Sequence, residues 1–313
     1  MIKKLFLFFF IFLLVHLHSE NSTSLYFTPN QKVDKVILKT VSQAKHSVYI
    51  SVYSFYWKDL ACLLKELKNL KKIDVKILVE KKLPKTIISG LGRKNIKVDK
   101  NKSSLFHSKF IIIDNKLLLV GSLNFTKESL YSDHNNLLIF TNPDFIKFFK
   151  DKFFSWWEGK PICKFYKSKN IEIYFSPENN CEEKIQEYIS SSVHSIYFAN
   201  FDFTSENIAE KIAKRKLAGV KVYGIIERSK VFPYSVFYFL KDFGCEMRKS
   251  NMAGLLHDKL FIIDKEIVIA GSYNPTRAAK KNIECLMIIK NKKLSEAFLK
   301  EWKSLWLWHS IAD

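Results

Sequence analysis

The chain repeats itself, and this repeat constrains its fold more than any other feature. The stretch HSKFIIID begins at His107, and HDKLFIID begins 150 residues later, at His257. Gly-Ser-x-Asn follows both stretches at the same spacing, from Gly121 and from Gly271. Weaker matches precede them in the same order: YFTPN with YFSPE, HSVYISVYSF with HSIYFANFDF, and VKILVE with VYGIIE. Two divergent copies of one domain, fused in one chain, explain this order.

Each copy predicts helices that alternate with strands. The hydrophobic patterns indicate helices at 31–45, 57–71, 181–193 and 205–217, and strands at 47–55, 75–79, 137–140, 195–203, 220–226 and 285–289. In both copies two apolar runs also flank a two-residue polar turn, which predicts a hairpin, although neither turn carries the preferred glycine. An aromatic stretch with helical spacing closes each copy and predicts core packing. Helices alternating with strands predict an α/β fold, and the hairpins predict mixed sheets.

Length and composition are compatible with two such domains. A chain of 313 residues with 47% hydrophobic content can form one large core or two medium ones. We place the first domain at 25–160, a linker at 161–173 and the second domain at 174–313. The net charge of +20 favours an acidic partner, such as nucleic acid, an anionic membrane face or a phosphate-bearing substrate. A lysine-rich genome composition explains the same charge equally well.

The N-terminus predicts export. Lys3 and Lys4 precede an unbroken apolar run from Leu5 to Val15. This run is shorter than the roughly 20 residues that a bilayer span needs. It therefore favours a secretory signal peptide at residues 1–22, with an uncleaved N-terminal membrane anchor as the alternative. Both alternatives predict an exported protein, either periplasmic or secreted.

The five cysteines do not form a metal-binding pattern. No CxxC pair is present, which disfavours zinc. Cys163 and Cys181 would form a disulfide in an oxidising compartment or would remain free thiols, and the sequence leaves both alternatives open. Cys62 and Cys285 are expected to be small buried apolar residues.

The repeated motif combines an imidazole and an ammonium on one face of a strand. Side chains two residues apart in a strand point the same way, as His107 and Lys109 do in one copy and His257 and Lys259 in the other. Lysine is a poor metal ligand, so we expect no metal and no cofactor. Lysine neutralises a phosphate oxygen, whereas histidine attacks phosphorus or moves a proton. The Gly-Ser-x-Asn segments add hydroxyl and amide donors for the phosphoryl oxygens, at Ser122, Asn124, Ser272 and Asn274.

The full pattern is His-x-Lys, four residues, Asp, six residues, Gly-Ser-x-Asn, and it occurs twice without a gap. It resembles the paired HKD motifs of the phospholipase D superfamily, and the resemblance covers about residues 25–310. The resemblance implies a phospholipase D fold of two α/β/α sandwich domains with mixed sheets, related by pseudo-twofold symmetry, in a monomer that is an internal pseudo-dimer. It also implies metal-independent phosphodiester hydrolysis through a covalent phosphohistidine. His107 is then the nucleophile and His257 the general acid and base, or the roles are exchanged.

The two copies differ in the residues that support the site. Many members of the superfamily follow the motif with Asn-x-Glu, which the second copy has as Asn282 and Glu284. The first copy has Asp133 and Asn135 instead. An asparagine can orient an imidazole but cannot stabilise its cation as a carboxylate does, so we expect unequal support for the two histidines. The motif aspartates close a strand before a turn, which favours a turn contact over catalysis. The predicted supporting residues are therefore Asp114, Asp264, Glu284 and Asn135.

The sequence favours a phospholipase D acting on phospholipid head groups only slightly. The export signal supports this substrate, and so does the aromatic stretch SKVFPYSVFYFLKDFG at 229–244, which is either a core helix or a lipid-facing lip. An exported non-specific nuclease is the alternative, because a basic protein gains affinity for a polyanion by counterion release. A transphosphatidylase and a non-catalytic phosphate-binding module are less favoured. The expected partners are thus a phospholipid or nucleic acid substrate and a membrane surface.

Overall fold

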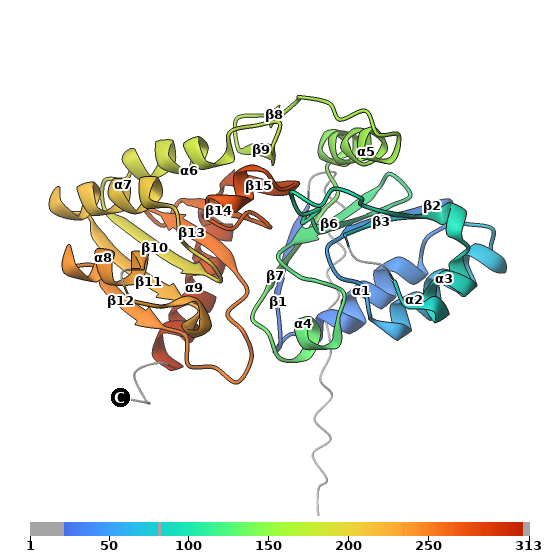
Figure 1. Ribbon diagram of the computed structural model, residues 1–313, viewed down its shortest axis with the longest axis horizontal. Helices are drawn as coiled ribbons and strands as arrows, with labels where there is room; N and C mark the ends of the chain where they lie inside the picture. Colours follow the sequence, from blue (N-terminus) through green and yellow to red (C-terminus); the bar gives the residue numbers. More distant parts are fainter. Residues whose placement is uncertain (1–21, 81–82, 234, 309–313) are drawn as a thin grey trace, which may run out of the picture.

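The computed structural model describes residues 22–80, 83–233 and 235–308. The signal peptide or anchor predicted at residues 1–22 lies outside this part of the chain, apart from its last residue. Within the described ranges, no helix has the length and apolar character needed to cross a membrane. Each copy of the repeat forms one sheet, and the two sheets lie side by side with helices on their outer flanks (Figure 1).

The two sheets have equivalent strands in equivalent order. In sheet order, the first sheet consists of β1 (Thr23–Phe27), β7 (Asn136–Phe140), β6 (Leu117–Gly121), β5 (Phe110–Ile113), β2 (Ser47–Val52), β3 (Asp74–Val79) and β4 (Ile96–Val98). The second sheet begins with an additional edge strand, β8 (Tyr166–Lys167). In the same direction as the first sheet it then consists of β9 (Ile171–Ser176), β15 (Glu284–Lys290), β14 (Ile267–Gly271), β13 (Lys259–Ile263), β10 (Ser195–Asn200), β11 (Lys221–Ile226) and β12 (Glu246–Lys249). Both contain parallel and antiparallel pairs, which confirms the predicted mixed α/β fold.

Helices cover both faces of each sheet, as in an α/β/α sandwich (Figure 1). The outer helices are α1 (Val33–Ser42), α2 (Lys58–Asn69), α3 (Lys85–Leu91), α6 (Cys181–Ser190), α7 (Glu206–Leu217) and α8 (Val236–Asp242). The inner helices are α5 (Pro143–Trp157) and α9 (Lys292–Trp308), and the short elements are α4 (Lys127–Tyr131), η1 (Arg93–Asn95), η2 (Arg228–Lys230) and η3 (Ala278–Lys280). Apolar residues spaced four apart explain the packing, since α1 buries Val33, Ile37 and Val41 against its sheet.

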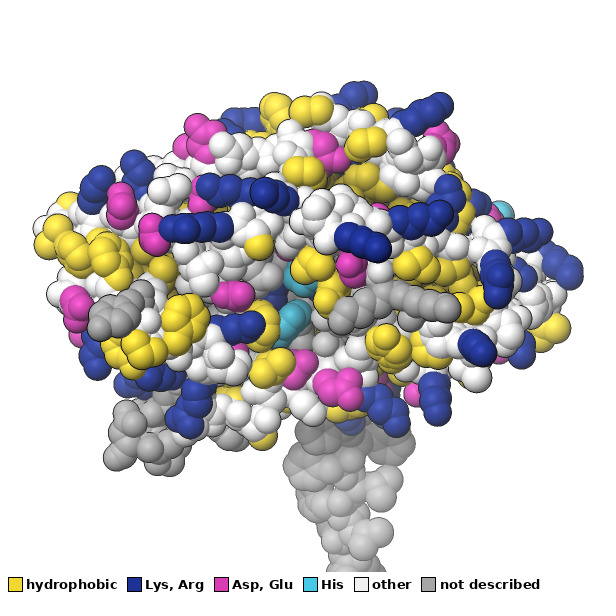
Figure 2. Space-filling view, viewed as in Figure 1, with side chains coloured by type: hydrophobic (Ala, Val, Ile, Leu, Met, Phe, Trp, Pro, Cys, Tyr) yellow, Lys and Arg dark blue, Asp and Glu magenta, His cyan; other side chains and the backbone are white. Residues whose placement is uncertain are grey.

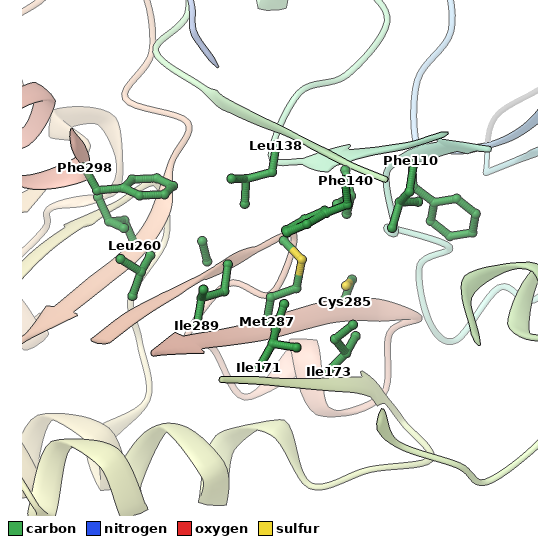
Figure 3. Close-up of a cluster of buried hydrophobic side chains, with 14 of the residues drawn as sticks. Phe110, Leu138, Phe140, Ile171, Ile173, Leu260, Cys285, Met287, Ile289 and Phe298 are labelled. Carbon is green, nitrogen blue, oxygen red and sulfur yellow. The ribbon is translucent and has the colours of Figure 1, made fainter. Parts of the chain in front are cut away.

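The inner faces of both sheets share one hydrophobic core. Figure 3 shows Phe140 of the first copy close to Met287 of the second, and Phe110 belongs to the same cluster. The aromatic stripes that close each copy enter this core, and Phe149 and Phe298 are both fully buried. These stripes therefore pack as the sequence predicted, and the shared core joins the two copies into one folding unit.

The predicted hairpins are present, and their turns use the backbone conformation that glycine normally supplies. Asp114 and Asn115 have φ values of 53° and 54°, and Asp264 and Lys265 have 52° and 59°. Two consecutive residues with positive φ, closed by a hydrogen bond from the N–H of Lys116 to the carbonyl of Ile113 at 2.9 Å, match a type I′ turn, and the strands pair on either side of it at Ile113 and Leu117. Aspartate and asparagine tolerate this region, whereas lysine adopts it at a higher cost.

The structure corrects two expectations at the cysteines. Cys163 and Cys181 are both free thiols, so the disulfide hypothesis is wrong. Cys163 is exposed, with its Sγ 3.2 Å from the carbonyl oxygen of Glu178, whereas Cys181 is buried at the start of α6. Cys62 is exposed rather than buried, because α2 directs Leu60 and its other apolar residues inward and leaves position 62 on the solvent side. Cys285 is buried as expected.

Part of the segment between the copies belongs to the second sheet. Strand β9 begins at Ile171, within the predicted linker at 161–173, and pairs antiparallel with β15. The short strand β8 pairs in turn with β9 and forms the edge of the sheet. The matching stretches YFTPN and YFSPE thus mark equivalent strands, β1 and β9, which the sequence matched but did not assign.

Candidate active site

The four motif residues lie at one end of the central strands β5 and β13. Strand β5 pairs with β2 and β6, and β13 pairs with β10 and β14, so both motifs occupy the middle of their sheets. His107 and His257 are each only 7% exposed, and Lys109 and Lys259 only 2%. Histidine atoms are visible at the centre of the face in Figure 2, between the two halves of the molecule. The two motifs therefore meet at the boundary between the copies.

Each motif is held by the backbone of the opposite copy. The N–H of His107 donates to the carbonyl of Ile283 at 2.9 Å, and the N–H of Ile283 donates to the carbonyl of Leu105 at 2.8 Å. The equivalent bridge in the second copy joins the N–H of His257 to the carbonyl of His134 at 2.9 Å. Neither histidine is thus positioned by its own copy alone.

The side-chain partners of the histidines are crossed in the same way. Nδ1 of His107 lies 2.7 Å from Oε2 of Glu284 in the second copy. Nδ1 of His257 lies 2.8 Å from Oδ1 of Asn135 in the first copy. Glu284 is fully buried and Asn135 is only 1% exposed, so water does not compete for these contacts. One imidazole therefore faces a carboxylate and the other a neutral amide.

Further hydrogen bonds orient the Asn135 amide. Ser122 Oγ donates to Asn135 Oδ1 at 3.1 Å, and Asn135 Nδ2 donates to the carbonyl of Ser129 at 3.2 Å. With the amide oxygen thus directed at the imidazole, Nδ1 of His257 must carry the proton that it donates. Nε2 of His257 is then available for proton transfer with a substrate.

The two lysines are anchored next to their histidines. Lys109 Nζ donates to the carbonyl of His107 at 2.5 Å, and Lys259 Nζ donates to the carbonyl of His257 at 2.6 Å. Each ammonium keeps donors that these bonds do not use, because a lysine has three. These buried cations form a site suited to an anion.

An aromatic ring packs on the histidine–lysine pair of each copy. The ring comes from the segment after β2 in the first copy and from the segment after β10 in the second. The ring of Tyr53 is 5.0 Å from that of His107, and the ring of Phe201 is 5.0 Å from that of His257, measured between centroids. Lys259 Nζ lies 5.0 Å from the centroid of Phe201. These two rings were not among the site residues predicted from the sequence. Their signal was their matching position in HSVYISVYSF and HSIYFANFDF.

Burial favours the neutral form of both imidazoles. It lowers the pKa of His107 to about 4, although the Glu284 carboxylate acts in the opposite direction. Burial, followed by the charge of Lys259, holds the pKa of His257 well below its usual value. Burial alone would raise the pKa of Glu284, but His107 and Lys109 hold it low, so this carboxylate is ionised. Neutral imidazole is the form that attacks phosphorus.

Burial also weakens the charge of the lysines. The pKa of Lys259 is lowered to about 7, and that of Lys109 is held well below its usual value. For both groups burial is the largest cause, and the Glu284 carboxylate partly opposes it. A bound phosphate anion would restore the charged form of both lysines.

The four predicted phosphate-binding residues divide into two pairs. Ser122 Oγ accepts the N–H of Asn136 at 3.1 Å, and Ser272 Oγ accepts the N–H of Cys285 at 2.9 Å, so both hydroxyls lie in the orienting network. Asn124 and Asn274 differ from the serines, because their buried Oδ1 atoms have no hydrogen-bond partner in the described part of the chain, as is also true of Asn136 and Asn200. The Oδ1 atoms of Asn124 and Asn274 can accept from a ligand donor, whereas a phosphoryl oxygen would need the Nδ2 donors of the same amides.

The glycine of each Gly-Ser-x-Asn segment allows a close approach of the next strand. A Cβ at Gly121 would lie 2.1 Å from the carbonyl oxygen of Asn136, and a Cβ at Gly271 would lie 2.3 Å from that of Cys285. Gly271 also has a φ of 139°, which disfavours a side chain. This close approach brings the strands that carry Asn135 and Glu284 next to the motifs.

The motif aspartates bind backbone groups at the opposite end of the hairpin. The Asp114 carboxylate accepts the N–H groups of Lys45, His46 and Ser47 at 2.7 to 2.8 Å. The carboxylate of Asp264 accepts the equivalent three N–H groups before β10. Burial would raise the pKa of both groups, but these donors hold it below its usual value. Both aspartates thus stabilise the hairpin turn.

Three carboxylates near the site, those of Asp258, Glu227 and the half-buried Glu80, were given no role from the sequence. Asp258 lies inside the second motif, and its Oδ1 accepts a hydrogen bond from Asn136 Nδ2 at 2.7 Å. Burial raises the pKa of Asp258 to about 7. Oε2 of Glu227 accepts the N–H of Leu256 at 2.8 Å, and Glu80 makes the equivalent bond in the first copy. The signal for these two glutamates was their shared position at the end of VKILVE and VYGIIE.

Comparisons with known proteins agree with the repeat. The family model described as "Cardiolipin synthase, PLD-like domain" matches residues 37–157 and again residues 185–306. A phospholipase D of Rickettsia prowazekii is 31% identical over 137 residues, which are 43% of this chain and 67% of that protein. A mitochondrial cardiolipin hydrolase of Canis lupus familiaris is 31% identical over 77 residues, or 24% of this chain and 30% of that protein. The structure of a phosphatidylserine synthase of Haemophilus influenzae is similar in fold, with a TM-score of 0.66 at 12% identity over 91% of this chain and 86% of that chain.

Proposed function

The chain belongs to the phospholipase D superfamily, and we propose that it is a phosphodiesterase of the phospholipase D type, with a phospholipid head group as its substrate. The reaction proceeds through a covalent phosphohistidine and needs no metal ion. One observation carries the proposal. Two buried imidazoles meet at the boundary between the copies, each with Nδ1 held by the opposite copy and each beside a buried lysine.

In the first step, Nε2 of His107 attacks phosphorus while Nδ1 remains paired with Glu284. The new P–N bond places a positive charge on the ring, which the ionised carboxylate stabilises at 2.7 Å. The P–O bond to the leaving alcohol breaks, and protonated His257 gives its Nε2 proton to that oxygen. The bound phosphodiester anion opposes the lysine charges that lower the pKa of His257, and so favours the protonated form.

In the second step, His257 acts as the base. It is neutral after the first step and takes a proton from water, whose oxygen attacks phosphorus as the P–N bond to His107 breaks. Lys109, Lys259 and the amides of Asn124 and Asn274 bind the non-bridging oxygens in both steps. The carboxylate next to His107 supports assigning the nucleophile to that residue, because the phosphohistidine is the cationic intermediate.

Two further observations bear on the substrate. Relatives that carry the names phospholipase D and cardiolipin hydrolase support a phospholipid. The charge of +20 favours the second candidate, an exported non-specific nuclease. A transphosphatidylase and a phosphate-binding module without catalysis are the least favoured, the latter because both motifs are complete.

A parallel assay in EDTA separates these functions. Purified protein is given phospholipid vesicles, single- and double-stranded DNA, and RNA, with His107→Ala and His257→Ala as inactive controls. Release of the head group with loss of activity in both variants supports the proposal. Cleavage of nucleic acid alone replaces it with the nuclease, and cleavage of none of them replaces it with the binding module. Full activity in either variant contradicts the two-histidine mechanism.

We also propose that the protein is exported, acts at a membrane surface, and is a monomer whose two copies form the pseudo-dimer. Export is supported by the basic residues and the apolar run at the N-terminus. A fusion of residues 1–30 to a reporter that is active only outside the cytoplasm tests it, with Leu5–Val15 deleted as the control. Sedimentation equilibrium at a mass of 36.7 kDa or slightly less supports a monomer, and twice that mass contradicts it.

A further inference from the structure

Helix α8 and the segment before it expose aromatic rings that the fold does not bury. We call Phe232, Tyr238, Phe239 and Phe243 the aromatic surface. Their exposed fractions are 54%, 37%, 36% and 39%, respectively. The opposite side of α8 packs into the core through Phe237 and its neighbours. The stretch therefore contributes both to the core and to an exposed apolar surface.

The equivalent helix of the first copy shows that the fold does not require these rings. Helix α3 buries Ile87 and Leu91, which occupy the positions of Val236 and Leu240 in α8. In this alignment Tyr238 and Phe239 correspond to the sequence Ser-Gly at positions 89–90. The repeat thus supplies an internal comparison in which the same helix has a polar outer face. The difference points to a partner for α8.

The aromatic surface is continuous with the candidate active site. Lys230 Nζ lies 5.0 Å from the ring centroid of Phe201, which itself lies 5.0 Å from the ring of His257. Phe232 follows Lys230 by two residues, and a cavity of about 510 Å³ lies between Phe232, Phe239 and Thr204. Figure 2 shows hydrophobic side chains on the left of the face that has the histidines at its centre, the side on which Figure 1 places α8.

We propose that the aromatic surface docks onto the face of a phospholipid bilayer and holds the active site at the level of the head groups. This inference rests on the proposed function and deepens it, because it names the surface through which that site reaches its substrate. Phe and Tyr rings beside lysines are the composition of surfaces that bind in the interfacial region of a membrane.

The charges around the aromatic surface are mixed, since Glu206, Glu210 and Arg277 line the cavity beside Phe232 and Phe239. Lys249 Nζ lies 5.1 Å from the ring centroid of Tyr238 and donates to its hydroxyl at 2.9 Å, and Lys241 is exposed on α8 itself. Asp242 is also exposed on this helix. We therefore expect the rings to provide most of the affinity, and anionic lipid to strengthen it moderately.

Hydrogen exchange measured on the full chain tests this docking surface locally. A local measurement is needed because every variant keeps the apolar N-terminal run, so overall binding to vesicles would not isolate the aromatic surface. Exchange is measured by mass spectrometry with and without vesicles of phosphatidylglycerol and phosphatidylcholine. We expect at least tenfold slower exchange of the amides at 231–244 on vesicles, with no change at 85–91. The double variant Phe232→Ser/Phe239→Ser should lose the protection. Phe165→Ser, which removes a ring that is 55% exposed in the segment between the copies, should keep it.

Either of two results would overturn the inference: no protection of 231–244 in the wild type, or equal protection in the double variant. Both replaced rings are exposed, so the variants should keep the thermal midpoint of the wild type. Turnover gives an independent readout. The turnover of the double variant should fall at least tenfold below that of the wild type on vesicles. On bis(p-nitrophenyl) phosphate, which is soluble in water, its turnover should stay within twofold of the wild type. A wild type that hydrolyses no lipid refutes the proposed function, whereas the exchange data still decide whether the surface docks.

Discussion

The Glu284→Gln variant should reduce turnover about a thousandfold while leaving the fold intact. Glutamine keeps the length of the side chain and can still accept a hydrogen bond from His107 Nδ1. The substitution therefore removes the negative charge and little else, and it makes the two imidazole partners chemically alike. The neighbouring hydrogen bond from Asn282 Nδ2 to Glu284 Oε1, at 3.4 Å, can also be kept by an amide.

The magnitude follows from the geometry of the buried pair. Two unit charges about 4 Å apart attract each other by about 4 kcal/mol at an effective dielectric constant of about 20. In the proposed first step the cationic ring that forms at His107 is attracted to this charge in the transition state, whereas the neutral imidazole before attack is not. A difference of about 4 kcal/mol corresponds to about a thousandfold in rate, at about 1.36 kcal/mol per tenfold. Asn135→Ala removes only a neutral acceptor, worth about 1–3 kcal/mol, and should reduce turnover about 10- to 100-fold.

Single-turnover kinetics on labelled substrate separates formation of the intermediate from its hydrolysis. The trapped phosphohistidine is identified by its sensitivity to acid. We expect Glu284→Gln to slow formation of the intermediate, the step that also releases the alcohol, more than Asn135→Ala does. Thermal unfolding of each variant serves as the folding control. Equal losses in the two variants, or a loss below tenfold in Glu284→Gln, would refute the assignment of the charged partner to the nucleophile.

Three further outcomes are expected. Lys265→Gly should raise the free energy of unfolding by about 1 kcal/mol, because lysine at a φ of 59° is strained. Asn115→Gly should raise it less, and chemical denaturation measures both changes. Asp264→Asn should cost about 1–2 kcal/mol at pH 7, because the charge that three N–H donors bind is lost; since the folded pKa is depressed, this difference should vanish as the pH falls through that pKa. The KM should rise above about pH 7, where Lys259 loses its charge; a KM independent of pH from 6 to 9 would contradict its role in binding phosphate.

The order of helices and strands was largely predictable because both copies carry the same periodic patterns. The hairpin at Asp114 and its equivalent at Asp264 were found from a polar pair between apolar runs, although the glycine rule argued against a tight turn. The turns form because each carboxylate binds three N–H groups from a distant segment, and no local rule contains that contact. The elements between β3 and β5 remained unassigned because α3 is short, and the stretch that contains α8 was left as either a core helix or a lipid-facing lip because its pattern differs between the copies.

The candidate catalytic pairs were visible in the sequence, but the contacts that support them were not. Spacing placed His107 and Lys109 on one face of a strand, which is local information. The contact between His107 and Glu284 spans 177 positions, and the one between His257 and Asn135 spans 122. The sequence predicted unequal support without showing which histidine each residue holds. That answer depends on how the two sheets pack, which is set by the shared core rather than by either motif.

The crossed contacts explain why unequal support can exist in this chain. In a dimer of identical subunits, each histidine would receive the same partner from the other subunit, so both imidazoles would face a carboxylate or both would face an amide. Fusion of the two copies removes that constraint, because Glu284 and Asn135 belong to different segments of one chain and can be changed independently. The proposed reaction is itself asymmetric, since one imidazole would become a phosphorylated cation and the other would only exchange a proton. A carboxylate stabilises the cation of the first imidazole. Beside the second imidazole, a carboxylate would hold the proton that the leaving alcohol needs.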